Sequence, residues 1–262
     1  MKNTVLKILI LCHLLLIPSK YAYSFDLQGI QPLHPYGTFS TFSAYSLEKD
    51  NWGVGLSTER SIDPNFYRFT LVTAYGITDT IEIIGNVPFV LDYFNDEGVE
   101  DISIGYKQRI LSESQVGPTV SYLLTFSVPG KERFSYDGRA GAGIIVSKRI
   151  GPFLGNINML YFKPTNASLE DEYQLRLGFD MAAGHNFNLL AELLVKKSHF
   201  SEKIDQVEGR LGYRVKVSSG YFGTLGLGYD FKNREPEVRI FLSLSVVLPV
   251  KEKKIKKIYE EE

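Results

Sequence analysis

Three histidines outside the first 24 positions, His34, His185 and His199, are the residues best suited to acid-base chemistry. A hydrolase would need one of them beside a Ser or Thr nucleophile and an orienting partner. His199 comes closest, because Ser198 and Ser201 flank it, but no Gly-x-Ser-x-Gly motif accompanies it. We favour solvated loop histidines and predict no catalytic residue. The alternative is a hydrolase built on His199 and Ser201.

Five acidic residues gather in one short stretch, namely Asp92, Asp96, Glu97, Glu100 and Asp101. Carboxylates at this density can bind calcium, or bridge to lipopolysaccharide through divalent ions. Solvated loop charge is the simpler interpretation, so we predict no metal site. The Gly-x-Gly pairs of the chain lack the third glycine and the strand-to-helix switch of a dinucleotide site, so we predict no bound cofactor.

Residues 1–24 have the pattern of a cleaved signal peptide. An apolar stretch follows Lys7 and ends near Pro18, and Ala22-Tyr23-Ser24 provides a small-x-small cleavage site. The stretch is too short to span a membrane. The single cysteine, Cys12, lies inside it. We therefore expect a mature chain without disulfides or cysteine-based metal sites.

Charge and hydropathy narrow the class further. Lys2, Lys7 and Lys20 would leave with the signal peptide, so 26 of the 29 basic residues stay against all 30 acidic ones, a formal charge of about −4. This balance gives no electrostatic basis for binding nucleic acid. Beyond residue 24 no apolar run approaches the roughly 18 residues of a membrane helix. A soluble β protein or a membrane β-barrel remains.

Apolar and polar residues alternate with a period of two along most of the chain. In 173–181, for example, Tyr, Leu, Leu, Phe and Met alternate with Gln, Arg, Gly and Asp. Successive side chains of a strand point to opposite faces, so each such segment has one apolar and one polar face. The pattern predicts strands at 38–47, 52–61, 66–75, 80–90, 100–111, 118–128, 138–149, 153–163, 171–183, 187–197, 204–217, 222–232 and 237–248.

The connections between these strands alternate between short and long, as in barrels with short periplasmic turns and longer outer loops. Placing the short ones in the periplasm gives about twelve spanning strands over 52–250, with both ends periplasmic. An even number of strands with both ends periplasmic leaves no place for 38–47 as a spanning strand. We therefore expect 25–51 to be a periplasmic or luminal segment, or to add one strand. Residues 251–262 form a charged tail. A disordered extension is the favoured interpretation of this tail, and a partner-binding segment is the alternative.

The favoured fold is therefore all-β, a single antiparallel transmembrane β-barrel of about twelve strands. A soluble sandwich also alternates, but the predicted strands are longer than the usual five or six residues and match the nine to eleven that cross a bilayer. Lipid cannot hydrogen-bond a free sheet edge, so the sheet must close. Aromatic residues near strand ends would form interfacial girdles; they are Tyr75, Phe89, Tyr93, Phe153, Tyr161, Tyr173, Phe187, Tyr221 and Phe231.

The polar faces of the strands would line the lumen of such a barrel. Both signs of charge occur there, which suits ion pairs filling a narrow interior as well as an open pore. Gly53, Gly55, Gly141, Gly143, Gly226 and Gly228 share the inward face, where small residues relieve crowding and let the sheet bend. The predicted lumen-lining charges are Arg68, Glu82, Lys107, Arg109, Arg149, Arg176, Asp180, Glu192, Lys196, Glu208, Arg210, Arg214, Lys216, Asp230 and Arg239.

Three short motifs resemble a family of bacterial outer-membrane barrels named for the meta-pathway of phenol degradation. Residues 98–107, GVEDISIGYK, are similar to its Gly-x-x-Asp-hydrophobic-x-hydrophobic-Gly-x-Lys strand. Residues 75–79, YGITD, resemble its Tyr-Gly-hydrophobic-Thr-Asp turn, and Val128-Pro129-Gly130 resembles its Leu-Pro-Thr-Gly without the Thr. The likeness is best over 70–135.

The resemblance implies a barrel in the outer membrane of a Gram-negative cell, in contact with lipid and lipopolysaccharide. It also implies that small solutes, aromatic or hydrophobic ones included, pass through it. The alternatives from a different class are the hydrolase above and a plugged structural barrel that transports nothing. The solute and the oligomeric state are not named by the sequence.

Overall fold

The computed structural model describes residues 28–62, 64–135, 137–232 and 238–249; the predicted signal peptide and charged tail lie outside these ranges. Its strands are β1 (Asn51–Ser61), β2 (Phe66–Gly76), β3 (Ile81–Tyr93), β4 (Asp96–Val99), β5 (Ile102–Leu111), β6 (Thr119–Val128), β7 (Arg139–Ile150), β8 (Phe153–Pro164), β9 (Glu172–Gly184), β10 (Phe187–Lys197), β11 (Gln206–Ser218), β12 (Tyr221–Asp230) and β13 (Val238–Pro249). A short 3₁₀ helix, η1 (Glu132–Phe134), follows β6. None of the described helical residues forms a helix long and apolar enough to cross a membrane.

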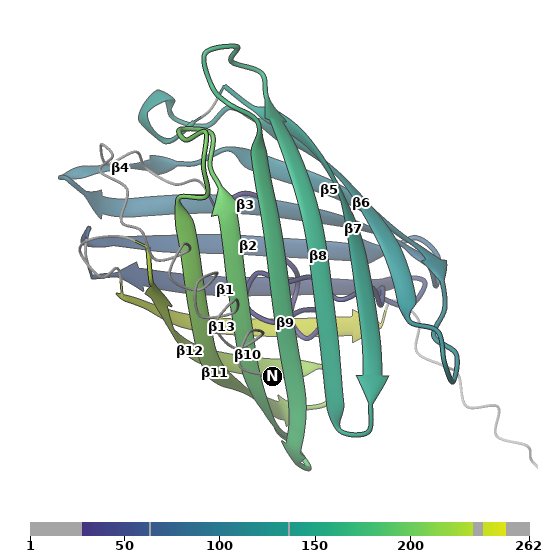
Figure 1. Cartoon of the computed structure of the whole chain (residues 1–262). Coiled ribbons are helices and arrows are strands. Elements are labelled where there is room, and N and C mark those ends of the chain that lie inside the picture. Colours follow the sequence, from purple (N-terminus) through teal and green to yellow (C-terminus); the bar gives the residue numbers. More distant parts are fainter. Residues whose placement is uncertain (1–27, 63, 136, 233–237, 250–262) are drawn as a thin grey trace, which may run out of the picture.

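The strands close into an antiparallel barrel (Figure 1). Neighbours in the chain pair in sequence, β3 pairs with β5, and β1 pairs with β13 through contacts such as Leu56↔Leu244. The short strand β4 pairs only with the end of β3 and extends that hairpin beyond the barrel wall. Twelve strands therefore form the wall, and the predicted all-β antiparallel barrel is confirmed.

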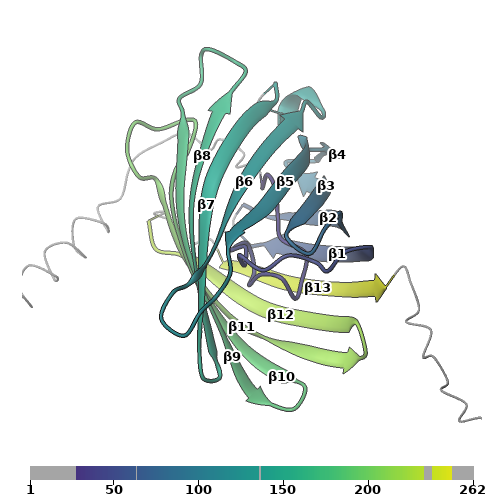
Figure 2. The ribbon, with the colours of Figure 1, turned by 90° about the vertical axis from the view of Figure 1, so that its right-hand side faces the viewer.

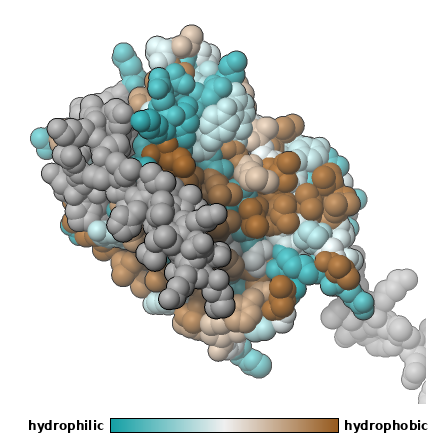
Figure 3. All heavy atoms as spheres, viewed as in Figure 1, coloured by the Kyte–Doolittle hydropathy of each residue, from teal (hydrophilic) through white to brown (hydrophobic). Residues whose placement is uncertain are grey.

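The wall has two chemically different faces because its side chains alternate. Along β5, Ser103 and Lys107 are 1% and 0% exposed, whereas Ile104 and Ile110 are 54% and 55% exposed. The outward face is apolar on every wall strand, and hydrophobic side chains gather on the visible wall, with hydrophilic ones near its upper end (Figure 3). Lipid favours such a surface, whereas water does not.

Aromatic pairs lie toward both ends of the wall. The ring centroids of Trp52 and Tyr75 lie 4.7 Å apart near the short turns, and those of Tyr161 and Tyr173 lie 5.3 Å apart near the long loops. Tyr93, predicted to belong to a girdle, is instead 5% exposed and packs with Phe66, Val90 and Phe134. The predicted girdle position of Tyr93 is wrong, because the β3–β4 hairpin and η1 cover this side chain. Alternation alone does not reveal that cover.

Residues 28–47 lie inside the ring of strands, and 48–50 lead to β1 beside the β2–β3 turn; both ribbon views show this part of the chain as a purple trace (Figures 1 and 2). We call residues 28–47 the luminal segment. The strand expected at 38–47 does not form: the described residues there make one isolated bridge, Gly37↔Phe42, and no ladder. The backbone of this segment is bound by side chains of the wall instead of by another strand.

Candidate functional site: the lumen and its segment

An apolar core joins the luminal segment to the wall. Ile30, Leu33, Phe42, Ala44 and Leu47 are each at most 3% exposed. They pack against inward-facing wall residues, which are Val72, Ala74, Ile84, Leu123, Ile145, Leu160 and Phe162. This part of the lumen is therefore a packed protein interior rather than a water-filled channel, since buried apolar groups exclude water.

Wall side chains bind the backbone of the segment residue by residue. Asn158 of β8 accepts from Phe42 N at 2.6 Å and donates to Phe42 O at 2.8 Å. Ser147 of β7 accepts from Ala44 N at 2.8 Å, and Ser121 of β6 donates to Ala44 O at 2.6 Å. These bonds take the place of a β ladder, because a buried backbone group must find some partner.

Charged side chains continue the same pattern on both sides of these contacts. Glu82 of β3 accepts from Leu47 N at 2.7 Å. Lys107 of β5 donates to Ser43 O at 2.9 Å and Tyr45 O at 2.7 Å. Lys107 and Glu82 also pair with each other at 2.8 Å.

Glu192 of β10 is the main anchor of the segment. Its carboxylate accepts from the backbone N–H groups of Ser40 and Thr41, both at 2.8 Å, and from the hydroxyls of Thr38 and Ser40 at 2.9 and 2.7 Å. Arg210 of β11 donates to it at 2.9 Å. Five donors on one buried carboxylate hold the turn at 38–41 tightly, because hydrogen bonds to a charged acceptor are the strong ones.

The end of the segment next to β1 is held by the β5–β6 turn. Tyr45 donates its hydroxyl to Glu113, which also accepts from Arg149 N at 3.0 Å and pairs with Lys148 at 3.2 Å. The Tyr45 hydrogen bond, with help from these donors, lowers the pKa of Glu113 below its ordinary value. Glu113 therefore stays ionised at neutral pH.

Buried side chains of alternating charge form a chain of ion pairs that ends at Glu192. Glu59 pairs with Arg68 at 3.1 Å and with Arg239 at 3.4 Å. Glu208 pairs with Arg239 at 3.4 Å and with Arg210 at 2.6 Å, which leads to Glu192. Each charge has an opposite neighbour, as burial of ions requires.

Twelve of the fifteen predicted lumen charges are buried inside the barrel: Arg68, Glu82, Lys107, Arg176, Asp180, Glu192, Lys196, Glu208, Arg210, Arg214, Asp230 and Arg239. Arg109, Arg149 and Lys216 lie at strand ends beside the short turns, where Arg149 and Lys216 are exposed and Arg109 is half-buried. They are on the predicted face but at the rim, because the wall strands extend past the packed interior.

Sequence reasoning missed several inward residues that hold the interior together, chiefly Glu59, Arg139, Asn158 and Glu172. Glu59 shares the parity of Gly53 and Gly55, and Glu172 that of Gln174 and Arg176, so the alternation itself could have found them. Asn158 has the parity of buried Asn156 but carries no charge, so a search for charges passed it over.

Inward glycines make room for the segment. A Cβ at Gly53 would lie 1.9 Å from Leu33 Cδ2, and one at Gly226 would lie 2.2 Å from Phe39 Cε1. Such distances are far inside van der Waals contact, so both side chains rest directly on the backbone of the wall. The sequence predicts that Gly53 and Gly226 relieve crowding, and the side chains that they accommodate belong to the luminal segment.

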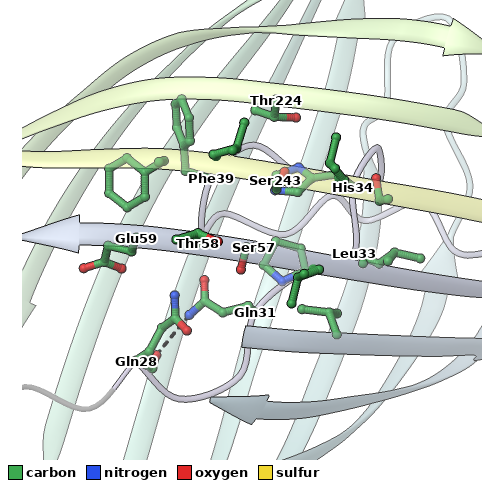
Figure 4. Close-up of a pocket in the computed structure, with 18 of the residues that line it drawn as sticks. Gln28, Gln31, Leu33, His34, Phe39, Ser57, Thr58, Glu59, Thr224 and Ser243 are labelled. Atoms are coloured by element: carbon green, nitrogen blue, oxygen red, sulfur yellow. Dashed lines mark hydrogen bonds between the residues drawn. The ribbon is translucent and has the colours of Figure 1, made fainter. Parts of the chain in front are cut away.

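A pocket remains between the segment and strands β1, β12 and β13 (Figure 4). Its cavity volume is about 40 Å³, and the space around it opens to solvent. Figure 4 shows that Ser57, Ser243 and Thr224 come from three adjacent strands, while Gln31 and His34 come from the luminal segment.

The alternative hydrolase is not supported by the surroundings of His199. Its Nδ1 lies 2.6 Å from Glu170 O and its Nε2 lies 3.6 Å from the Glu172 carboxylate. Ser201 accepts from Lys203 N at 3.1 Å. Burial lowers the pKa of His199, which is 1% exposed and not a solvated loop residue as predicted. The described contacts give His199 a structural position between loop and wall.

The acidic stretch is divided by the fold. Glu100, 0% exposed, accepts from Arg68 at 2.5 Å, and Asp101, 1% exposed, accepts from Gly130 N at 3.2 Å. Asp96 pairs with Lys131 at the surface. Solvated loop charge is thus wrong for Glu100 and Asp101. Glu100 is bound by Arg68 and Gln28 N inside the barrel, and Asp101 is bound by the loop after β6. Within the described ranges no group of three or more His, Cys, Asp or Glu side chains is arranged to hold a metal ion.

Solved structures share this fold. An outer membrane channel from Pseudomonas putida F1 matches with a TM-score of 0.59 and 11% identity, over 78% of this chain and 98% of that one. The KdgM porin matches with a TM-score of 0.58 and 7% identity, and the NanC porin with 0.56 and 12%, each over 74% of this chain and 98% of the other. No family model matches the chain, and no curated protein matches it. At these identities the likeness establishes the barrel fold.

Proposed function

We propose that the protein is an outer-membrane channel for small solutes, without catalytic activity. The observation that carries the proposal is the closed twelve-stranded wall, apolar outside and polar inside. Such a surface is stable only in lipid, and a signal-peptide pattern at 1–24 would export the chain to the outer membrane. The structural neighbours named above are themselves called channels and porins, which supports the same function.

The luminal segment would control passage through this channel. It fills the lumen between β3 and β11, so in the arrangement described here solute passes only if the segment shifts. The motifs at 75–79, 98–107 and 128–130 favour the meta-pathway family, and that resemblance implies aromatic or hydrophobic solutes. A plugged structural barrel is the competing function, because the packed interior would suit it equally.

Conductance in planar bilayers tests the proposal. The full chain should conduct weakly, and a chain lacking residues 28–47 should conduct at least tenfold more, because the deletion removes the segment and leaves the wall strands intact. Heat-modifiable migration on gels would show that each variant is a folded barrel. A protein soluble without detergent would overturn the membrane assignment. A folded deletion variant that does not conduct would favour the plugged barrel.

A further inference from the structure

We propose that residues 29–33 of the luminal segment are the gate of the channel, and that solute passes between them and strands β1, β12 and β13. This inference rests on the proposed channel function and assigns its moving part and its route. The rest of the luminal segment stays on the wall, where hydrogen bonds hold it.

The gate lies between two attachment points of the segment. On one side of it, Gln28 N donates to the buried Glu100 carboxylate at 3.1 Å. On the other side, Arg214 of β11 donates to His34 Nδ1 at 3.0 Å. A short stretch between fixed points can open locally while the rest of the fold stays in place.

The hydrogen bonds of the gate stay within the segment. The Gln31 amide donates to Gln28 O at 3.0 Å, and Leu33 O accepts from Tyr36 N at 2.8 Å. Over the ranges that the structure describes, no hydrogen bond joins residues 29–33 to a wall strand. Movement of the gate therefore leaves no buried charge without a partner, whereas lifting the segment from Glu192 would do so.

The contact of the gate with β1 is apolar. Leu33 lies over Gly53 and Gly55, with its Cδ1 3.2 Å from where a Cβ would stand on Gly55. Leu33 thus fills space that these wall positions leave empty. Separating two apolar surfaces breaks no directional bond, and an apolar solute that enters restores the dispersion contacts that Leu33 gives up.

The inward face of β1, β12 and β13 consists mostly of small side chains. They are Gly53, Gly55, Ser57, Thr224, Gly226, Gly228, Ser243 and Ser245. The opposite part of the wall presents bulky side chains to the segment, namely Leu123, Ile145, Leu160 and Phe162. Withdrawal of Leu33 would therefore leave open space along β1, because no wall side chain there is large enough to fill it.

Packing is already incomplete at this place. The cavity of about 40 Å³ lies against Gln31 and Leu33 on one side and against β1, β12 and β13 on the other, and the space around it opens to solvent. Dense packing resists separation because every atom loses contacts, and a gap removes part of that resistance. The gate therefore faces the strands from which it separates at reduced cost.

Opening would also satisfy polar groups that are unpaired when the gate is closed. The side-chain oxygens of Thr224, Ser243 and Ser245 are buried and have no hydrogen-bond partner among the described residues. Water that enters the open route would bond to them, which offsets part of the cost of exposing Leu33.

Conductance of Leu33→Ala and Leu47→Ala in planar bilayers tests the gate. Both leucines belong to the buried core of the segment, at 3% and 0% exposed, but Leu47 lies in the part held by Glu82. Leu33→Ala removes a contact made only in the closed state, so conductance should rise at least fivefold over wild type. Leu47→Ala should change it less than about twofold. No rise in Leu33→Ala, or an equal rise in Leu47→Ala, would overturn the proposal.

Two engineered disulfides in a chain with Cys12→Ser test the route without removing packing. Leu33→Cys with Gly53→Cys ties the gate to β1, since Leu33 Cγ lies 3.3 Å from the Cβ position of Gly53. Thr41→Cys with Gly178→Cys is the matched control on the fixed part, where Thr41 Cβ lies 2.9 Å from the Cβ position of Gly178. Oxidation should lower conductance at least fivefold in the first pair and leave it unchanged in the second, and reduction should restore it. Equal conductance of the first pair in both states would refute the route.

Deletion of residues 28–47 separates this inference from the channel proposal. A conducting deletion variant, together with gate variants that behave like wild type, would refute the gate alone. A folded deletion variant that does not conduct would refute the channel itself. Heat-modifiable migration on gels shows that each variant compared is a folded barrel.

Discussion

The two sides of the lumen hold the same segment by different means. On the anchoring side, which we define as β3 and β5–β11, charged and amide side chains bind the backbone of 38–47 directly. On the hydroxyl side, defined as β1, β12 and β13, the segment rests Leu33 on Gly53 and Phe39 on Gly226, and hydroxyls stay without partners. The anchoring side fixes the segment, and the hydroxyl side leaves room beside it.

The largest expected effect comes from a substitution that disrupts the anchoring side. Glu192→Ala removes the acceptor of four donors at 38–41 and one of the two carboxylates paired with Arg210. We expect a loss of about 3–5 kcal/mol in the free energy of unfolding, as for other buried ion pairs that lose one partner. Urea unfolding followed by the fluorescence of Trp52, the single tryptophan, measures it.

Glu202→Ala is the control, because Glu202 is exposed in the loop after β10 and should change stability by less than about 0.5 kcal/mol. Equal stability of the two variants would mean that the segment is not anchored through Glu192. Bilayer conductance should rise in Glu192→Ala and stay at the wild-type level in Glu202→Ala.

A second prediction tests whether the apolar outer face of the wall lies against lipid. Leu124→Arg places a charge in the middle of the outward face of β6 and should cost about 2–4 kcal/mol, whereas Ile110→Arg, near the short turn after β5, should cost about 0–1 kcal/mol. Both side chains are similarly exposed, at 50% and 55%, so depth in the bilayer is the variable. Unfolding in lipid vesicles gives both values. An equal cost at the two positions would contradict the proposed placement in the membrane.

A third prediction sharpens the description of the hydroxyl side. Gly226→Ala should cost about 1–3 kcal/mol, because its Cβ meets Phe39 at 2.2 Å and the Leu211 carbonyl oxygen at 3.1 Å. Gly223→Ala on the same strand meets only Leu244 at 3.7 Å and should be nearly neutral. If the two variants unfold at the same urea concentration, Phe39 does not occupy the position described.

The smallest effect concerns pH on the anchoring side. Burial lowers the pKa of His199 below its ordinary 6.5. The unfolded chain therefore takes up a proton before the folded one does, and stability should fall as pH drops below about 6.5. His199→Gln should flatten this part of the profile of unfolding free energy against pH. A profile identical in wild type and His199→Gln would remove His199 as the cause.

Much of the wall was predictable from the sequence, and the content of the lumen was not. Alternation is a local signal, so it predicted the twelve wall strands and the inward face of residues such as Lys107 and Glu192. The position of the luminal segment was not predictable from alternation, because its partners are side chains 35 or more positions away, such as Glu82 for Leu47 and Asn158 for Phe42. Alternation also suggested a strand at 38–47, where the backbone bonds to side chains instead.

The inward glycines show the same limit. The sequence predicted that these glycines face inward, but it did not show what they make room for. Leu33 and Phe39 approach Gly53 and Gly226 only in the folded barrel. The hydroxyls at 224, 243 and 245 were likewise unremarkable in the sequence. They line the pocket only because the luminal segment lies beside these strands in the folded barrel.

The central claim is that the luminal segment is packed inside the barrel, and cysteine labelling tests it most directly. In a chain with Cys12→Ser, one variant carries Ala44→Cys, at a position 0% exposed, and another carries Val116→Cys, at a turn position 92% exposed. With a hydrophilic maleimide under native conditions, we predict rapid modification of Val116→Cys and at least a hundredfold slower modification of Ala44→Cys, with equal rates after unfolding. Equal rates in the native proteins would show that the segment is not packed in the lumen.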